Sequence, residues 1–275
     1  MKRIKRICSA VALAALAATA SGEPAATEPV QISAEDLLAE LQKLNALDAL
    51  ATRPTANPSN FGVTGGFGLP RGALALSLSY TDEKPSPQKD EFITGDGSAG
   101  AAIGFGDPYD LVGLDLLLGV VSVGDGPGED GTLGVRLHRV LPGFVAGGRS
   151  SVSIGVDNGV QWGDASETEN YSGAFSTVLP MSSGVSTMLT VGYGSKASRD
   201  DGDADGGVFG SIGLGWNPYI NTTAAWTADE LLLTAGFKPF LNRNLMVTAG
   251  AGDVTDELDN RRFLLTVSWF TQNLF

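Results

Sequence analysis

The chain offers few side chains that could carry out catalysis. Acyl transfer needs a nucleophile beside a histidine base, and His138 is the only histidine among the 275 residues. No GxSxG nucleophile motif occurs. His138 shares one side of an alternating run with Arg136. We therefore predict that the protein is not an enzyme, has no cofactor, and holds His138 as an inert interior residue; a gating or ligand role is the alternative.

A run of alternating aspartates is the second feature that could do chemistry. Asp201, Asp203 and Asp205 alternate with small residues and are followed by Gly206, as in the first half of a calcium-binding loop. The twelfth position of such a loop would be Ile212, which cannot supply the closing carboxylate. We interpret the run as an acidic solvated loop, with weak binding of a divalent cation at these three aspartates as the alternative.

The charge balance narrows the possible partners. The sequence has 18 Lys and Arg against 31 Asp and Glu, a formal net charge of −13. Nucleic acid is therefore not an expected partner, because its phosphates are held by clustered basic residues. The chain contains 37 Gly, is 43% hydrophobic and only 18% charged, which excludes a disordered chain or a long coiled coil. A glycine-rich, strand-forming protein is expected.

Residues 1–20 have the pattern of a secretory signal peptide. Four basic residues precede an apolar run from Ile7 to Ala17, and the small residues Ala18, Thr19 and Ala20 follow. The run is shorter than the roughly 20 residues that a membrane-spanning helix needs. Removal of this peptide would also remove Cys8, the one cysteine, and the mature chain could then form no disulfide.

Residues 21–71 are predicted to form a separate segment that contains a helix. Ser33 and Asp36 suit a helix N-terminus, and leucines at three- and four-residue spacing extend the pattern to residue 51. The helix 33–51 is too short to bury its leucine face alone, so we expect it to pack on a partner. The stretch from Thr52 to Gly72 is rich in Pro and Gly and is interpreted as a linker.

From Ala73 onward the hydrophobic period changes to two. In residues 73–80 the larger side chains Leu74, Leu76, Leu78 and Tyr80 alternate with Ala and Ser, and the same alternation recurs to the C-terminus. The pattern predicts twelve strands, near residues 72–80, 97–105, 110–122, 131–139, 150–162, 170–179, 184–195, 207–216, 219–226, 230–237, 244–252 and 261–270.

The two faces of these strands differ in a way that excludes a soluble sandwich. A sandwich buries its bulky residues and exposes polar ones, whereas here one face is bulky and the other is small or polar and never becomes a face of large residues. Long acidic connections also alternate with shorter ones. We predict an all-β fold, a 12-stranded antiparallel transmembrane β-barrel over residues 72–275 with a short N-terminal helix. A narrower barrel packed by its own side chains would suit eight strands better.

Aromatic residues mark the ends of the predicted strands. Tyr80, Trp162, Tyr193 and Trp226 fall near the long connections, whereas Trp216 and Trp269 fall near the short ones, as in two interfacial girdles. The chain ends in Phe275, preceded by the alternating residues Phe263, Leu265, Val267 and Trp269. In this it resembles Gram-negative outer-membrane β-barrel proteins, although Thr271 and Asn273 interrupt the alternation. The resemblance covers residues 73–275 and implies the barrel-assembly machinery as a partner during biogenesis.

The predicted lumen carries few residues that ionise. They are Asp115, Arg136, His138, Glu230 and Arg262. A general porin would line its channel with more charge. Our leading hypothesis is a narrow, porin-like channel or transporter for a small solute; the alternative is a non-conducting barrel that presents acidic surface loops and a periplasmic docking helix. An autotransporter-like translocation unit ranks third, because no passenger precedes Ser33.

Three further expectations concern orientation and partners. Both termini should be periplasmic, and the long acidic loops should face outside, toward lipopolysaccharide and other outer-membrane lipid. Part of Ser33 to Gly72 should lie at the periplasmic mouth or inside the barrel, because its backbone groups need partners if they are buried. The leucine face of the helix should meet the lumen wall, a periplasmic partner or another copy of the chain.

Overall fold

The structure is a computed structural model and describes residues 57–82, 96–120, 129–145, 147–163, 169–180, 184–198, 205–240, 244–272 and 274. The chain divides into two units, Met1–Arg53 and Pro54–Phe275. The predicted signal peptide 1–20 and the predicted helix 33–51 lie outside the described residues. Within the described part of the chain, no helix is long and apolar enough to cross a membrane.

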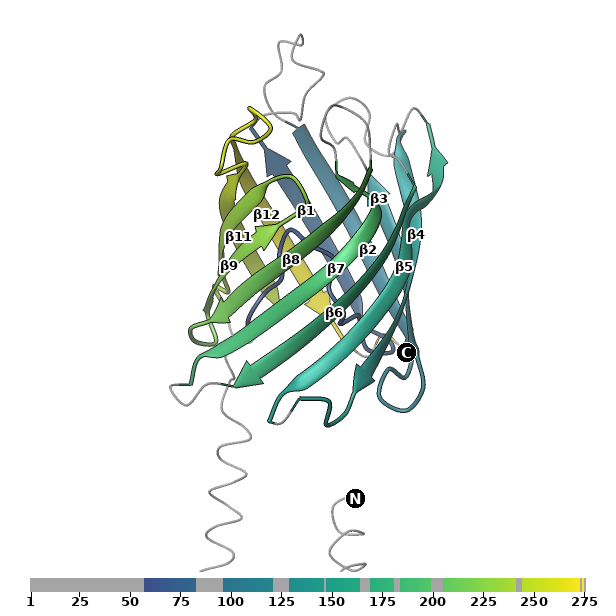
Figure 1. Cartoon of the computed structure of the whole chain (residues 1–275). Coiled ribbons are helices and arrows are strands. Elements are labelled where there is room, and N and C mark those ends of the chain that lie inside the picture. Colours follow the sequence, from purple (N-terminus) through teal and green to yellow (C-terminus); the bar gives the residue numbers. More distant parts are fainter. Residues whose placement is uncertain are drawn as a thin grey trace, which may run out of the picture. The chain divides into compact units, whose positions relative to one another are not determined.

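Twelve antiparallel strands close into one barrel, as Figure 1 shows. Each strand pairs with its neighbours in sequence, and β1 pairs with β12 to close the ring. The all-β, 12-stranded fold class is confirmed. The strands are β1 Leu74–Thr81, β2 Asp96–Gly106, β3 Gly113–Val120, β4 Gly131–Leu141, β5 Arg149–Trp162, β6 Asn170–Pro180, β7 Ser186–Ser198, β8 Asp205–Gly215, β9 Ile220–Trp226, β10 Leu231–Phe237, β11 Leu245–Gly252 and β12 Arg262–Thr271.

Strand bounds differ from the prediction mainly at β3, which was expected from residue 110 and begins at Gly113. The side chain of Asp107 accepts the N–H groups of Tyr109 and Asp110, at 2.8 and 3.2 Å. Its carbonyl accepts the N–H of Leu111 at 3.0 Å. These bonds hold a turn that competes with strand pairing over residues 107–112. Glu230, expected to open a strand, lies one residue before β10.

The two ends of the barrel differ in their connections. At one end, called the turn end here, lie the start of β1, the end of β12 and the described residues 107–112, 142–145, 147–148, 184–185, 216–219, 238–240 and 244. At the other, called the loop end, lie the end of β1, the start of β12 and the described residues 82, 129–130, 163, 169, 227–230 and 253–261. Exposed aromatic side chains occur near both ends: Tyr80, Tyr171, Tyr193 and Trp226 near the loop end, and Phe144, Trp216, Tyr219 and Trp269 near the turn end.

The bulky face of the strands is the outer wall. Leu76, Leu116 and Ile154 are exposed, and their chain neighbours Asp115 and Ser153 are buried inside the ring. The predicted assignment of faces is therefore confirmed. A wall of exposed apolar side chains is unfavourable in water and favourable in hydrocarbon.

The interior is less uniformly small than the sequence pattern predicts. Met188, Phe209 and Leu232 are buried on the lumenal side, so the expectation of a face without large residues is wrong at these positions. Phe209 lies over Gly192 of the neighbouring strand, which has no side chain to displace it. Leu232 contacts Gly62 from the segment that precedes the barrel. Large residues are accommodated where a glycine faces them.

Asp253 organises the loop between β11 and β12. Its carboxylate accepts the backbone N–H groups of Glu257, Leu258 and Asn260, at 2.8, 3.2 and 2.8 Å. Burial would raise the pKa of this carboxyl, but these hydrogen bonds, with the positive charge of Arg262, outweigh it and hold the pKa below its usual range. The ionised form is therefore the one that the folded loop favours.

We expect the order of this loop to depend on pH. Because the pKa of Asp253 is lower in the folded loop than in the unfolded chain, its stabilisation is fully present above about pH 4 and is lost as the pH falls through the folded value. Hydrogen-exchange protection of the amides of Glu257, Leu258 and Asn260 should fall over that range. Asp253→Asn should lower the same protection about tenfold at neutral pH. The exposed Asp256→Asn is the control, and equal effects of the two variants would contradict this role for Asp253.

Candidate functional site in the barrel lumen

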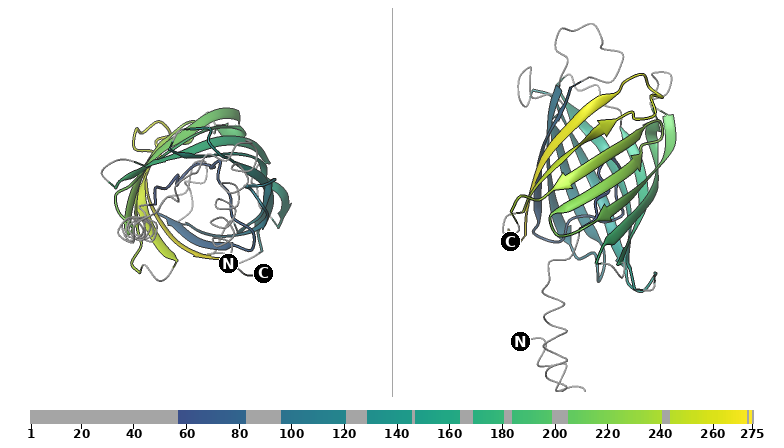
Figure 2. Two further views of the ribbon diagram at one scale, coloured as in Figure 1. Left: turned by 90° about the horizontal axis from the view of Figure 1, so that it is seen from below. Right: turned by 90° about the vertical axis from the view of Figure 1, so that its left-hand side faces the viewer.

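Residues 57–72, called the lumenal segment here, lie inside the barrel, and Figure 2 shows them within the ring of strands. Four hydrogen bonds join the segment to buried side chains of the wall: Thr223 Oγ1 to the Ser59 carbonyl (3.1 Å), Ser153 Oγ to the Gly65 carbonyl (2.9 Å), the Gly66 N–H to Ser176 Oγ (2.8 Å) and the Leu69 N–H to Asp115 Oδ1 (3.1 Å). The backbone groups of a chain without regular structure thus find partners away from water.

The segment passes from one side of the barrel to the other. Its first hydrogen bond to the wall is with β9 through Ser59, its middle ones are with β5 and β6, and its last joins Leu69 to β3. In the closed ring, β9 and β3 are six strands apart out of twelve, which places them opposite each other. The segment then ends at the wall, where the Gly72 N–H donates to the Gly104 carbonyl of β2 at 2.9 Å. It therefore narrows the lumen across its width.

Close packing explains why this stretch is rich in glycine. Gly62 has φ +95°, and a Cβ placed there would lie 2.5 Å from Leu232 Cδ1. A Cβ on Gly68 would collide with the side chains of His138 and Asp115. The Pro- and Gly-rich composition, interpreted from the sequence as a linker, allows the backbone to lie directly against the wall.

His138 and Asp115 form a buried pair beneath the segment. Each residue is 2% exposed, and His138 Nδ1 lies 3.6 Å from Asp115 Oδ2. The imidazole lies between Gly68 and Gly113, each of which would collide with it if it carried a Cβ. Neither ring nitrogen has a hydrogen-bond partner among the described residues. Within this part of the chain, no hydroxyl therefore lies within hydrogen-bond distance of the imidazole.

Arg136 is the strand partner of Asp115 and forms an ion pair with a second carboxylate, nearer the loop end. Arg136 Nη2 lies 3.6 Å from Asp157 Oδ1, and the two side chains are 18% and 26% exposed. Ser172 Oγ donates to Asp157 Oδ2 at 3.3 Å. Asp157 was not among the residues singled out from the sequence. The two-residue spacing of Ser153, Gly155 and Asp157 along β5 could have identified Asp157 as inward-facing, because alternate residues of a strand lie on the same face.

Glu230 and Arg262 form a separate ion pair at the loop end. Arg262 Nη2 lies 2.5 Å from Glu230 Oε1, and both side chains are about nine-tenths buried. Arg262 Nη1 also donates to the Asn260 carbonyl at 3.3 Å. The five lumenal residues proposed from the sequence are therefore divided between two groups at different heights. Asp115, Arg136 and His138 lie together, whereas Glu230 and Arg262 lie apart from them.

The aspartate run gives no metal centre among the described residues. Asp205 is the first residue of β8, and Asp201 and Asp203 lie outside the described part of the chain. Within that part, no group of three or more His, Cys, Asp or Glu side chains could hold a metal ion.

Removing the Asp115 carboxylate should loosen the lumenal segment. Asp115→Ala is expected to raise the hydrogen-exchange rate of the Leu69 amide roughly 10- to 100-fold, because leaving a buried N–H without its acceptor costs about 1 to 3 kcal/mol. Asp115→Asn retains an acceptor and should have a smaller effect. The control is Ser79→Ala, which removes a hydroxyl that pairs with Thr266 of the wall at 2.9 Å. An unchanged Leu69 exchange rate in Asp115→Ala would contradict this role.

The closed ring and its apolar outer wall together identify the kind of protein. In hydrocarbon every backbone N–H and C=O must be paired within the protein, and a closed barrel achieves this for strands. The outer wall is a band of exposed Leu, Ile and Val with aromatic residues near both ends. This is the architecture of transmembrane β-barrels, the fold of outer-membrane β-barrel proteins.

No protein-family model matches the chain, and no curated protein sequence matches it either. Its fold is similar to several solved outer-membrane barrels. The KdgM porin in complex with disordered oligogalacturonate has 11% identity and a TM-score of 0.46, over 72% of this chain and 98% of that one. The COG4313 outer membrane channel from Pseudomonas putida F1 has 13% identity and a TM-score of 0.46, over 74% and 97%. The Acinetobacter baumannii outer membrane protein Omp33 has 11% identity and a TM-score of 0.41, over 74% and 99%.

Proposed function

We propose that the protein is a narrow outer-membrane channel for a small solute, and that the lumenal segment restricts its pore. The observation that carries this proposal is the path of residues 57–72 from β9 to β3 across the lumen. A barrel of twelve strands has an interior wider than its own small side chains fill. We propose that the segment occupies part of that space and that a small solute passes beside it.

The polar groups of the lumen suit a small, uncharged, hydrogen-bonding solute. Hydroxyl side chains lie on the lumenal side of the wall, among them Ser151, Ser176, Thr190 and Thr248. Two of the lumenal carboxylates are each paired with a cation, since Arg136 faces Asp157 and Arg262 faces Glu230. Paired charges produce a weak field at a distance, so we expect little selection between anions and cations.

Single-channel recording of the full chain in planar lipid bilayers tests the proposal. We expect discrete conductance steps that are small for a barrel of twelve strands and nearly equal in permeability to potassium and chloride. Uptake of neutral sugars by proteoliposomes should decline with sugar size. The absence of both current steps and sugar uptake, from protein whose folded barrel is shown by heat-modifiable gel mobility, would refute the channel.

The alternative function is a non-conducting barrel that presents acidic loops and docks a periplasmic partner. The observation that favours it is the number of bonds that hold the segment, four of which reach different strands. A segment held this firmly could close the lumen permanently. The predicted helix 33–51 would then bind a periplasmic partner or a second copy, and the acidic loops would contact lipopolysaccharide, directly or through a divalent cation at Asp201, Asp203 and Asp205.

We further propose that the loop end faces the outside of the cell and the turn end faces the periplasm, where both termini would lie. Thr255 is exposed in the loop between β11 and β12, and Pro142 is exposed in a turn at the opposite end. In cysteine variants, a membrane-impermeant thiol reagent should label Thr255→Cys on intact cells and Pro142→Cys only after the outer membrane is permeabilised. The reverse pattern would overturn the orientation.

A further inference from the structure

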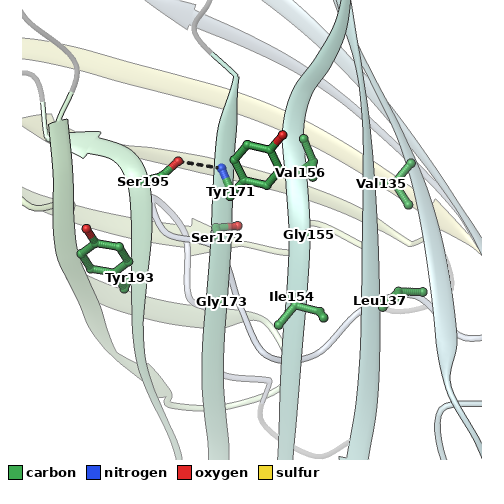
Figure 3. Close-up of a pocket in the computed structure, with 10 residues that line it drawn as sticks. All are labelled: Val135, Leu137, Ile154, Gly155, Val156, Tyr171, Ser172, Gly173, Tyr193 and Ser195. Carbon is green, nitrogen blue, oxygen red and sulfur yellow. Dashed lines mark hydrogen bonds between the residues drawn. The ribbon is translucent and has the colours of Figure 1, made fainter.

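The outer wall is hollowed over strands β4 to β7. Figure 3 shows the hollow, a groove of about 630 Å³ whose lining includes Val135, Leu137, Ile154, Tyr171, Gly173 and Tyr193. Most of these side chains belong to the exposed, bulky face of the wall. The groove therefore opens to the outside of the barrel and is separate from the lumenal site.

A missing side chain creates this groove. Gly173 of β6 pairs with Ile154 of β5 on one side and with Tyr193 of β7 on the other. Neighbouring strands are about 4.8 Å apart, so the space between these two flanking residues is roughly 10 Å wide at the backbone. Ile154 is 65% exposed, whereas Leu116, whose strand partners are Ile103 and Val135, is 43% exposed. The glycine leaves one flank of Ile154 uncovered.

The groove extends from the middle of the wall toward the loop end. Tyr171 is the second residue of β6, whose first residue adjoins the loop end. Figure 3 shows the rings of Tyr171 and Tyr193 on the two sides of β6, with Gly173 and Ile154 farther along the strands. Tyrosines prefer the level of lipid headgroups, and aliphatic side chains prefer the level of the acyl chains. The lining therefore changes along its length from tyrosines suited to the headgroup region to aliphatic residues suited to acyl chains, in the same order as the parts of a lipid molecule.

We propose that this groove binds one acyl chain of a lipopolysaccharide molecule, with the chain lying on Gly173 between Ile154 and Tyr193. An acyl chain fits this groove for two reasons. The groove is continuous with the part of the wall that faces hydrocarbon, and it is about as wide as a single extended chain. The assignment to lipopolysaccharide rests on the orientation proposed above, since the groove lies in the half of the wall nearer the loop end. Pore conduction has no part in it.

Filling the groove tests the proposal without straining the fold. A Cβ on Gly173 would have its nearest contacts at 3.7 Å from the Ser153 carbonyl oxygen and 3.8 Å from Ile154 Cγ2, which are ordinary distances. Gly173→Leu should therefore fold and occupy the groove. The matched control is Ala101→Leu, which places the same side chain on the outer wall elsewhere, since Ala101 pairs with Leu76 and Leu118.

The measurement is native mass spectrometry of the full-length protein in detergent after exposure to deep-rough lipopolysaccharide or to dimyristoylphosphatidylcholine. We expect the unmodified protein and Ala101→Leu to retain one lipopolysaccharide through detergent washing, and Gly173→Leu to lose at least nine-tenths of that retention. Equal retention by Gly173→Leu would overturn the site. Equal retention of the phosphatidylcholine would overturn the assignment to lipopolysaccharide, and a dimer abolished only by Gly173→Leu would show that a second copy occupies the groove.

These outcomes can be separated from failure of the other proposals. Heat-modifiable gel mobility reports whether each variant has folded. Labelling of Thr255→Cys reports the orientation on its own, and single-channel recording reports conduction on its own. A non-conducting barrel that still retains lipopolysaccharide through Gly173 would leave the lipid site standing.

Discussion

Deletion of residues 33–70 is expected to raise the single-channel conductance several-fold while the barrel still folds. The deletion removes the part of the lumenal segment that crosses from β9 to β3 and all four of its bonds to the wall. Arg71 and Gly72 remain, because the Gly72 carbonyl accepts the N–H of Leu274 at 2.9 Å and its own N–H donates to Gly104. The hydrogen bonds of Gly72 near the pairing of β1 with β12 are thereby kept, while the open area of the lumen increases.

The matched control is deletion of residues 33–56, which removes the predicted helix and keeps the lumenal segment. This variant should conduct like the full chain, and only the longer deletion should raise the conductance. If the full chain and both deletions are all non-conducting, the structural alternative replaces the channel. If all three conduct identically, the segment does not restrict the pore, and the helix is better explained as a periplasmic docking element.

A charged side chain on the outer wall should lower the stability of the folded barrel much more than the same side chain at the next residue, which points into the lumen. Leu76 is exposed on the outer wall and pairs with Trp269 of β12. An arginine on such a wall costs about 2 to 4 kcal/mol at mid-bilayer and less toward the interfaces. We therefore expect Leu76→Arg to lower the folded fraction, measured by heat-modifiable gel mobility and by urea unfolding in lipid vesicles. Similar changes are expected at Leu116, Ile154 and Val267.

The control for this prediction is Ser77→Arg, which points the same side chain into the lumen. Ser77 is half-buried and pairs with Ser268 and Gly100, so an arginine there can reach water inside the barrel. Ser153 also faces the lumen but is a poorer control, because it is 4% exposed and donates to the Gly65 carbonyl. Equal losses for Leu76→Arg and Ser77→Arg would show that the two faces are misassigned.

The number of strands and the two faces of the wall were predictable from the sequence. Each strand pairs with its neighbours along the chain, apart from the closing pair of β1 and β12. Alternation within a single strand therefore indicates which of its residues face lipid, independently of the other strands. Strand ends were predicted less well where a side chain such as Asp107 holds a turn.

The lumenal site depended on contacts between residues far apart in the chain. The bonds that place the segment join residues separated by 46 positions at Asp115, 88 at Ser153, 110 at Ser176 and 164 at Thr223. No local pattern encodes such pairs, although the Gly- and Pro-rich composition of residues 57–72 indicated a backbone in need of partners. The side chains of Asp115, Arg136 and His138 were identified as lumenal, but their grouping apart from Glu230 and Arg262 was not.

What the sequence determined by itself is therefore the periodic part of this protein: twelve strands, their lipid-facing residues and a mostly small or polar interior face. The tertiary structure decided the rest, namely the path of the lumenal segment, the partnership of Arg136 with Asp157, and the groove over Gly173. The physical reason is that a side-chain period of two is set by the backbone of each strand. A contact across the lumen or a gap between three strands exists only once the ring has closed.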